Sequence, residues 1–242
     1  MTRLQRQQPS ENVNALAELG LFSAGIMHEI KNALQGIANA LFLLGGEQSL
    51  SPRVRQEVEI ARRELSRALD VSAQTLALAR EENPVAMSIV EVLEEVLSRY
   101  SAKTAYKHFT IDRQYEFSGS IQGLPGAIRQ VFSNIVLNAL ESGPLENGKL
   151  VIHTFARRSS NNGKTPGVQI DFADNGPGIP DQYKKKVFQP LFSTKKGKGS
   201  GLGLWVARRL VLKQHGQISL VSRSEGLNSG TCFSVFLPLT QN

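Results

Sequence analysis

Two glycine-rich segments with lysines between them are the most chemically specific feature of the sequence. Residues 174–180 read Asp-Asn-Gly-Pro-Gly-Ile-Pro, residues 199–204 read Gly-Ser-Gly-Leu-Gly-Leu, and six lysines lie within 184–198. Glycine lets main-chain N–H groups come close to a ligand, and lysine supplies point positive charge. The two segments therefore predict a site for an anionic group such as a phosphate.

Asp174 opens the first of these segments, at the end of a predicted strand and just before the glycine turn. Its carboxylate is therefore held in one place and can accept a hydrogen bond from an exocyclic amine. On its own, Asp174 is equally typical of an ordinary Asp-Asn turn. The second segment opens a predicted helix over 202–214, whose free N–H groups and dipole favour a phosphate. Whether this is a nucleotide site depends on the rest of the chain.

His28 is the second candidate for chemistry. It follows Ile26 by two residues on a predicted helix, so it lies about 200° from the apolar stripe and faces solvent. Glu29 can hold the proton of one ring nitrogen and raise the basicity of the other, and Asn32 lies one turn further along the same face. An imidazole held in this way is a good nucleophile. Taken alone, the same pattern also describes a solvated surface histidine.

Asn134 and Asn138 form the third candidate group. Their spacing of four residues places both side-chain amides on one face of a helix predicted over 126–142. Asparagine supplies a neutral oxygen, which suits a Mg²⁺ ion that is held mostly by phosphates. In isolation, the alternative is one capping and one solvated asparagine.

The helix that positions His28 is expected to be long and to pair with a second one. Apolar residues recur every three or four positions over 19–44 and again over 54–79. A Gly-Gly pair at 45–46 ends the first helix, and Ser-Pro at 51–52 begins the second. Because one such hairpin has too small a core to be stable alone, we expect two copies to form a four-helix bundle.

The second half of the chain is expected to alternate helices with strands. Pro84 ends the second long helix, and Ser88 with Glu91 forms a capping box for the next one. We expect helices at 88–100, 126–142 and 202–214, and strands at 108–115, 120–122, 150–156, 168–173, 217–222 and 231–237. Helices beside a mostly antiparallel sheet predict a two-layer α/β sandwich.

Composition narrows the class of protein. The chain has 242 residues, a formal net charge of +7 and a single cysteine, Cys232, which excludes an internal disulfide and fits a reducing, cytoplasmic location. No apolar run is long enough for membrane insertion, and the N-terminus lacks the apolar core of a signal peptide. We expect no nucleic-acid partner, because the basic residues gather beside the glycine segments and no recognition motif is present.

Five segments together resemble the sequence boxes of sensor histidine kinases, in the order of that family. They are an H box at 28–32, an N box at 134–141, a first glycine box at 174–178, an F box at 187–195 and a second glycine box at 199–203. The resemblance implies an α-helical hairpin, which forms a four-helix bundle as a dimer. An α/β two-layer sandwich of the GHKL ATPase type follows it.

The resemblance also implies a domain order. Residues 1–13 are expected to be a flexible arm or a truncated input connection, and residues 14–82 a dimerisation and phosphotransfer hairpin. A linker over 83–87 leads to a catalytic ATP-binding domain over 88–242. Since no sensor domain precedes the hairpin, we expect either a truncated chain or sensor input from a separate protein.

In this family the site residues have defined roles, which the resemblance transfers to matching positions. Asp174 reads the adenine amine, Thr231 assists that contact, and Asn138 binds Mg²⁺. Residues 181–200 form a mobile lid over the triphosphate of ATP, in which Lys195 is best placed to neutralise phosphate charge. The other nucleotide-binding residues are Asn134, Gly176, Gly178, Gly199, Gly201 and Gly203.

The implied activity is autophosphorylation followed by phosphotransfer. Glu29 orients His28 and acts as base while the imidazole attacks the γ-phosphorus of Mg-ATP. The phosphohistidine then passes its phosphoryl group to an aspartate in the receiver domain of a response regulator. Asn32 stands where similar kinases position a water that dephosphorylates the regulator. We therefore expect a homodimer, joined through residues 14–82, that is both kinase and phosphatase.

Two positions depart from the family pattern. Ala33 replaces a proline that most relatives carry, so this helix is expected to be straighter. Glu141 stands where many relatives have a lysine or arginine near the phosphates. The acid at this position, together with the form of the H box, favours the nitrogen-regulation-like branch.

Two other functions fit part of the sequence. A GHKL ATPase of another purpose, such as a protein serine kinase, explains the nucleotide boxes but leaves the hairpin with His28 unexplained. A dimeric scaffold without catalysis is the second alternative. Asn138, Asp174 and the paired glycine boxes are intact, which counts against such a pseudokinase.

Overall fold

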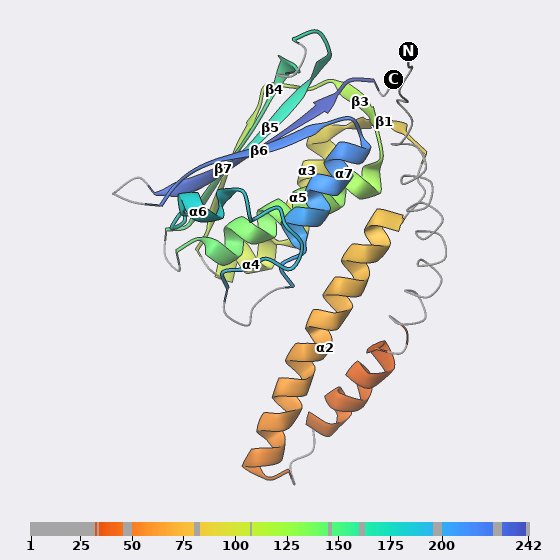
Figure 1. The fold of residues 1–242 in the computed structure, drawn as a ribbon, viewed down its shortest axis with the longest axis vertical. Coiled ribbons are helices and arrows are strands. Elements are labelled where there is room, and N and C mark those ends of the chain that lie inside the picture. The colour runs from red at the N-terminus through yellow and green to blue at the C-terminus, as the bar shows by residue number, and fades with distance from the viewer. Residues whose placement is uncertain are drawn as a thin grey trace, which may run out of the picture. The chain divides into compact units, whose positions relative to one another are not determined.

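The structure is a computed structural model that describes residues 32, 34–45, 50–79, 83–106, 108–144, 147–159, 163–195, 200–224 and 229–240 (Figure 1). The chain divides into two compact units, residues 1–81 and 82–242. Among the described helices, none combines the length and the apolar character that crossing a membrane requires.

The described part of the first unit is helical, as the apolar periodicity predicts. Residues 34–45 are helical, and α2 spans Pro52–Ala79. The hydroxyl oxygen of Ser51 accepts a hydrogen bond from the main-chain N–H of Val54 at 3.4 Å, which confirms the predicted helix start. Leu65 is buried, whereas Phe42 is 68% exposed. The predicted start of the first helix, at residue 14, lies outside the described residues.

The second unit begins with a strand that we did not predict. Strand β1, Val85–Ser88, pairs antiparallel with β3, Ser120–Gly123, in a two-stranded sheet. We expected residues 83–87 to be a linker, because Pro84 marked the end of the second long helix. Their partner strand lies more than thirty positions further along the chain, so local sequence could not reveal the pairing. Residues 85–87 are therefore part of the second unit.

The larger sheet has five strands in the order β2-β4-β5-β7-β6. Strands β2 and β4 run parallel, and the other neighbouring pairs of described strands are antiparallel. Their bounds are Thr110–Tyr115 for β2, Lys149–Arg158 for β4, Pro166–Asp174 for β5, Gln217–Arg223 for β6 and Gly230–Pro238 for β7. The mostly antiparallel sheet that we predicted is confirmed.

Helices cover one face of this sheet. Helices α3 (Ile89–Arg99), α5 (Pro125–Ser142) and α7 (Gly203–Lys213) lie together on that face, and the short α4 (Ser101–Tyr106) follows α3 (Figure 1). The α/β two-layer sandwich is therefore confirmed. As predicted, the hydroxyl oxygen of Ser88 caps α3 by accepting a hydrogen bond from the N–H of Glu91 at 3.3 Å.

The core lies between α5 and the sheet. Phe132 of α5 and Phe172 of β5 are almost fully buried, with ring centroids 5.5 Å apart. All the side chains that we expected on the buried face of α5 are buried: Ile128, Val131, Phe132, Ile135, Ala139 and Leu140. This packing fixes which face of α5 is left for Asn134 and Asn138, both of which are half-buried.

Candidate functional site

Asp174 is the last residue of β5, and its side chain is held by two main-chain groups. The carboxylate accepts a hydrogen bond from the N–H of Gly176 at 2.9 Å and another from the N–H of Thr231 on β7. Burial raises the pKa of Asp174, while these two N–H groups and the positive charge of Lys195 act in the opposite direction. The carboxylate therefore has one fixed orientation, as the position before the glycine turn predicted.

Two positions of the first glycine turn leave little or no space for a side chain. A Cβ on Gly176 would lie 2.8 Å from Oδ1 of Asp174. Gly178 has a φ of +73°, and a Cβ there would lie 2.0 Å from the carbonyl oxygen of Arg223. The turn therefore follows the Asp174 carboxylate closely and then packs against the end of β6.

Thr231, next to the Asp174 carboxylate, forms a hydrogen bond with Ser222 of β6. Its hydroxyl lies 2.8 Å from that of Ser222, whose oxygen also accepts a hydrogen bond from the N–H of Ile179 at 2.8 Å. Ser222 is a residue that the sequence did not single out. It lies at the last but one position of an ordinary strand, and only the pairing of β6 with β7 brings it next to Thr231.

The second glycine box leads into α7, as predicted. Gly201 has a φ of +70°, and a Cβ there would lie 2.7 Å from the carbonyl carbon of Leu191. Gly203 is the first residue of α7, and its carbonyl oxygen accepts a hydrogen bond from Nδ2 of Asn134 at 2.8 Å. Gly199 lies outside the described residues.

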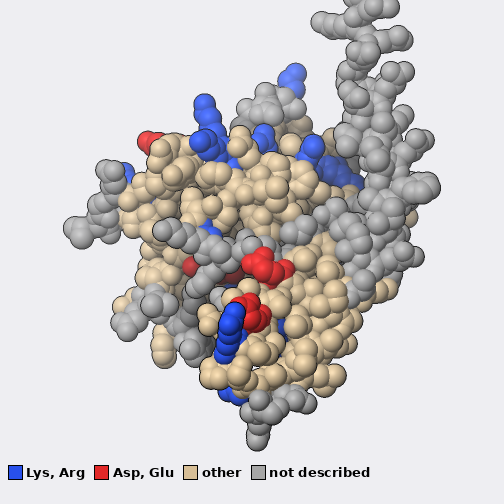
Figure 2. All heavy atoms as spheres, turned by 60° about the horizontal axis from the view of Figure 1, so that its bottom comes forward, with Lys and Arg blue, Asp and Glu red and all other residues tan. Residues whose placement is uncertain are grey.

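Lys195 and Asn138 come together at this site, although they are 57 positions apart in the sequence. The ammonium group of Lys195 donates to Oδ1 of Asn138 at 3.2 Å and lies 3.1 Å from Oε2 of Glu141. Lys103 of α4 reaches the other carboxylate oxygen of Glu141 at 3.8 Å. The space-filling view in Figure 2 shows acidic and basic side chains next to one another on a mostly uncharged face.

We identified Glu141 from the sequence only as a departure from a family pattern, and we did not consider Lys103. A usable signal existed for Glu141, because it follows Asn138 by three residues and so shares its face of α5. No comparable signal exists for Lys103, which comes from another helix.

The Oδ1 atom of Asn138 accepts a hydrogen bond from the ammonium group of Lys195, and a neutral oxygen in this position also suits a hard cation. Within the described residues, no group of three or more His, Cys, Asp or Glu side chains could hold a metal ion. A divalent cation at Asn138 would therefore take its other oxygen ligands from water or from a bound anion such as a phosphate.

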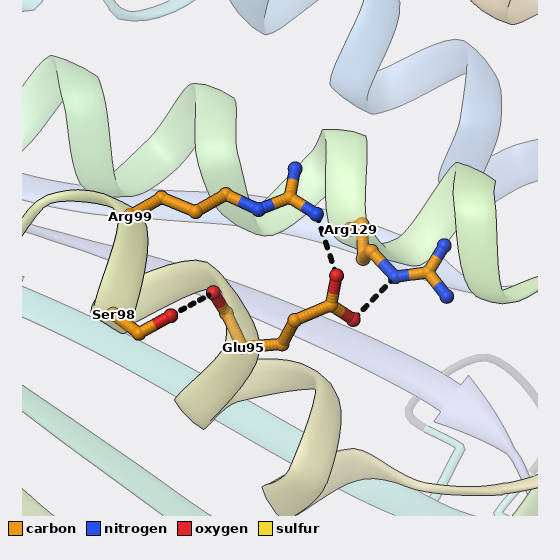
Figure 3. Close-up of polar contacts among 4 residues, drawn as sticks. All are labelled: Glu95, Ser98, Arg99 and Arg129. Carbon is orange, nitrogen blue, oxygen red and sulfur yellow. Dashed lines mark hydrogen bonds and ion pairs between the residues drawn. The ribbon is translucent and has the colours of Figure 1, made fainter.

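Helix α5, which carries both asparagines, is also fixed to α3. Glu95 of α3 accepts hydrogen bonds from Arg99 at 2.5 Å and from Arg129 of α5 at 2.6 Å (Figure 3). The hydrogen bond from Arg129 is the largest cause of a lowered pKa for Glu95. These contacts are exposed, so they join α5 to α3 but add little to the stability of the fold.

The histidine segment is described only in part. His28 and Glu29 lie outside the described residues, and so does Ala33. Asn32 is helical and exposed, in agreement with its predicted position on the solvent side of the helix. In the predicted lid, α6 spans Asp181–Lys184, and residues 196–199 lie outside the described residues.

Two family models match the chain in the regions of the two units. Residues 18–84 match the His Kinase A (phospho-acceptor) domain, and residues 123–241 match the histidine kinase-, DNA gyrase B- and HSP90-like ATPase. The second unit is thus an ATPase domain of the GHKL type. The chain as a whole belongs to the sensor histidine kinases, since it carries their phospho-acceptor domain followed by their ATPase domain.

Curated relatives of the chain are named as sensor kinases. Sensor protein kinase PilS of Pseudomonas aeruginosa is 30% identical over 227 residues, which cover 91% of this chain and 41% of PilS. Sensory histidine kinase/phosphatase NtrB of Escherichia coli O157:H7 is 31% identical over 219 residues, which cover 89% of this chain and 61% of NtrB. The chain therefore spans only about half the length of these relatives.

Solved structures show the same folds. The catalytic domain of histidine kinase ThkA is 27% identical with a TM-score of 0.56, and the match covers 66% of this chain and 99% of that domain. A structure of ThkA in complex with the response regulator protein TrrA is 25% identical with a TM-score of 0.62. That match covers 94% of this chain and 64% of the solved one.

Proposed function

We propose that this chain is an ATP-dependent protein-histidine kinase that phosphorylates its own His28 and transfers the phosphoryl group to an aspartate of a response regulator. The observation that carries the proposal is the Asp174 carboxylate, fixed by two main-chain N–H groups beside a glycine turn. The phospho-acceptor domain that precedes this site supplies the reason to expect a histidine as the target. The reported complex of ThkA with a response regulator supports the second step.

In this proposal the nucleotide lies between the two glycine boxes. Asp174 accepts a hydrogen bond from the adenine amine, and Thr231 supports the carboxylate from β7. The N–H groups at the start of α7, with Gly201 and Gly203, face the phosphates. Lys195 neutralises part of the phosphate charge. Gly176 and Gly178 let the turn follow the Asp174 carboxylate and pack against β6, so they support the adenine contact indirectly.

Asn138 is the residue that we expect to hold Mg²⁺. Its side-chain oxygen accepts a hydrogen bond from the ammonium group of Lys195 in the structure, so the same oxygen can bind a metal cation instead. When bound, Mg²⁺ would neutralise charge on the phosphates. Lys195 must leave Asn138 when the ion takes its place, because two cations at one oxygen repel each other.

The chemical step takes place on the hairpin. Glu29 holds the imidazole of His28 and takes the ring proton. The free ring nitrogen forms a bond to the γ-phosphorus, while the bond to the bridging oxygen breaks and ADP leaves. The phosphohistidine then gives its phosphoryl group to a carboxylate of the receiver domain.

A phosphatase activity is part of the proposal. Asn32 is exposed on its helix and can hold a water by hydrogen bonds. The name of NtrB, a kinase/phosphatase, supports this reading. We expect Asn32→Ala to keep autophosphorylation and lose dephosphorylation of the regulator, measured on purified phospho-regulator. If Asn32→Ala keeps full phosphatase activity, the assignment is wrong.

Incubation with labelled ATP tests the kinase assignment. We expect a phosphoprotein that is labile to acid, stable to alkali and absent from His28→Gln. Asn138→Ala serves as the matched control, because it should remove labelling while leaving His28 in place. ATP hydrolysis without label on His28 would favour a GHKL ATPase of another purpose. The absence of nucleotide binding would favour a dimeric scaffold.

A further inference from the structure

Asn134 lies one turn before Asn138 on α5, but its side chain contacts a different part of the site. Its Nδ2 donates to the carbonyl oxygen of Gly203 at 2.8 Å, and its Oδ1 accepts from Nε2 of Gln130 at 3.0 Å. Gly203 is both the last glycine of the second box and the first residue of α7. The side chain of Asn134 therefore links α5 to the start of α7.

The orientation of this amide is set by both contacts. Only the NH₂ group can face the Gly203 carbonyl, because two oxygens at this distance would repel each other. Gln130, one turn earlier on the same helix, donates to the Asn134 oxygen and so favours that orientation. Both ends of the half-buried amide are thus used within the protein.

A second amide links the C-terminal end of α7 to the N-terminal end of α5. Gln214, the C-cap residue of α7, is buried, and its Oε1 accepts a hydrogen bond from the N–H of Leu124 at 2.9 Å. Leu124 is the N-cap residue of α5. Sliding α7 along α5 would break both hydrogen bonds. The carbonyl of Gly203 and the N–H of Leu124 would then be left without their partners in a partly buried environment, which is unfavourable.

We propose that Asn134 is a positioning residue, which holds the N-terminus of α7 against α5 so that its free N–H groups and Asn138 meet the same phosphates. This inference rests on the proposed function, and it deepens it. Asn134 acts through Gly203 and does not contact the nucleotide, unlike the direct contact expected from the sequence. Asn138, by contrast, acts through the metal.

Binding measurements on the full chain can separate these roles. ADP with Mg²⁺, ADP with EDTA and adenosine are titrated into the wild type, Asn134→Ala and Asn138→Ala. We expect Asn134→Ala to weaken ADP binding about tenfold, in line with one lost hydrogen bond, with or without Mg²⁺. Adenosine affinity should not change, because Asp174 is untouched. Asn138→Ala should weaken ADP binding only when Mg²⁺ is present.

Gln130→Met gives a second, milder variant in case Asn134→Ala fails to fold. It removes the bond that orients the amide but leaves Asn134 in place, so it should show the same pattern with a smaller loss. The positioning role is refuted if either variant weakens adenosine as much as ADP, or if the loss disappears in EDTA. It is also refuted if both variants bind like a wild type that itself binds ADP. A wild type that binds neither ADP nor adenosine instead refutes the proposed function, and this role with it.

Discussion

At the scale of single residues, the carboxylate of Asp174 is kept where burial disfavours its charge. The N–H groups of Gly176 and Thr231 compensate in part, but the net effect is still a raised pKa. A surface aspartate would avoid this cost. A ligand that donates a hydrogen bond to the carboxylate would offset part of the free-energy cost of burying its charge. This is a physical reason to expect a nucleobase with an amino group here.

This raised pKa predicts how stability depends on pH. In the native state Asp174 binds a proton more readily than in the unfolded state, so its contribution to the free energy of unfolding falls as pH rises. This decrease begins near the ordinary pKa of an aspartate and ends just above the raised pKa of Asp174. Urea unfolding of the wild type and of Asp174→Asn over this range measures the difference. We expect the variant to lose this slope; equal slopes would contradict the shift.

The sequence predicted some site residues much better than others. The position of Asp174 followed from a strand that ends at a glycine turn, which is local information. The partners of Lys195 could not be predicted, because Asn138 and Glu141 are more than fifty residues away on another element. Asn134 and Asn138 looked equivalent by spacing, yet only tertiary contacts give them different partners.

At the scale of elements, Gly178 shows how a turn depends on its neighbour. Its positive φ disfavours any other residue, and the carbonyl of Arg223 occupies the space of a Cβ. Gly163 has a similar φ of +62° but has nothing within 4 Å of a Cβ. Substituting each of the two glycines therefore distinguishes the energetic cost of a positive φ alone from the added cost of a steric clash.

We expect Gly163→Ala to lower the free energy of unfolding by about 1 kcal/mol. Gly178→Ala should cost about 2 kcal/mol more, because β6 or the turn must move away. Denaturant unfolding of both variants measures this difference. Equal losses would mean that the turn after Asp174 can shift freely.

Most elements were predictable because their patterns are local. The buried face of α5 followed from helical spacing, and the cap of α3 from Ser88 and Glu91. Strand β1 was missed because its partner, β3, is distant in sequence. The parallel pairing of β2 with β4 was not predicted either, since strand spacing alone does not give direction.

At the scale of the whole molecule, the two units offer a way to locate nucleotide binding. Trp205 is the only tryptophan in the sequence and lies in α7, so its fluorescence reports on the second unit. We expect MgADP at a hundred times its Kd to stabilise this unit by about 2.7 kcal/mol. Asn138→Ala is the control and should shift much less. An unchanged Trp205 transition would contradict nucleotide binding in this unit.

The contacts of Lys195 have a consequence for ionic strength. Its charge is already balanced in part by Glu141, which Lys103 also approaches. When a bound triphosphate replaces Glu141 as the partner of Lys195, the lysine exchanges one anion for another. Binding therefore displaces few dissolved ions from around the protein. Added salt should therefore weaken nucleotide binding less steeply than the six lysines over 184–198 suggest. Glu141→Gln leaves Lys195 to be neutralised by dissolved ions, and should make nucleotide affinity more sensitive to salt.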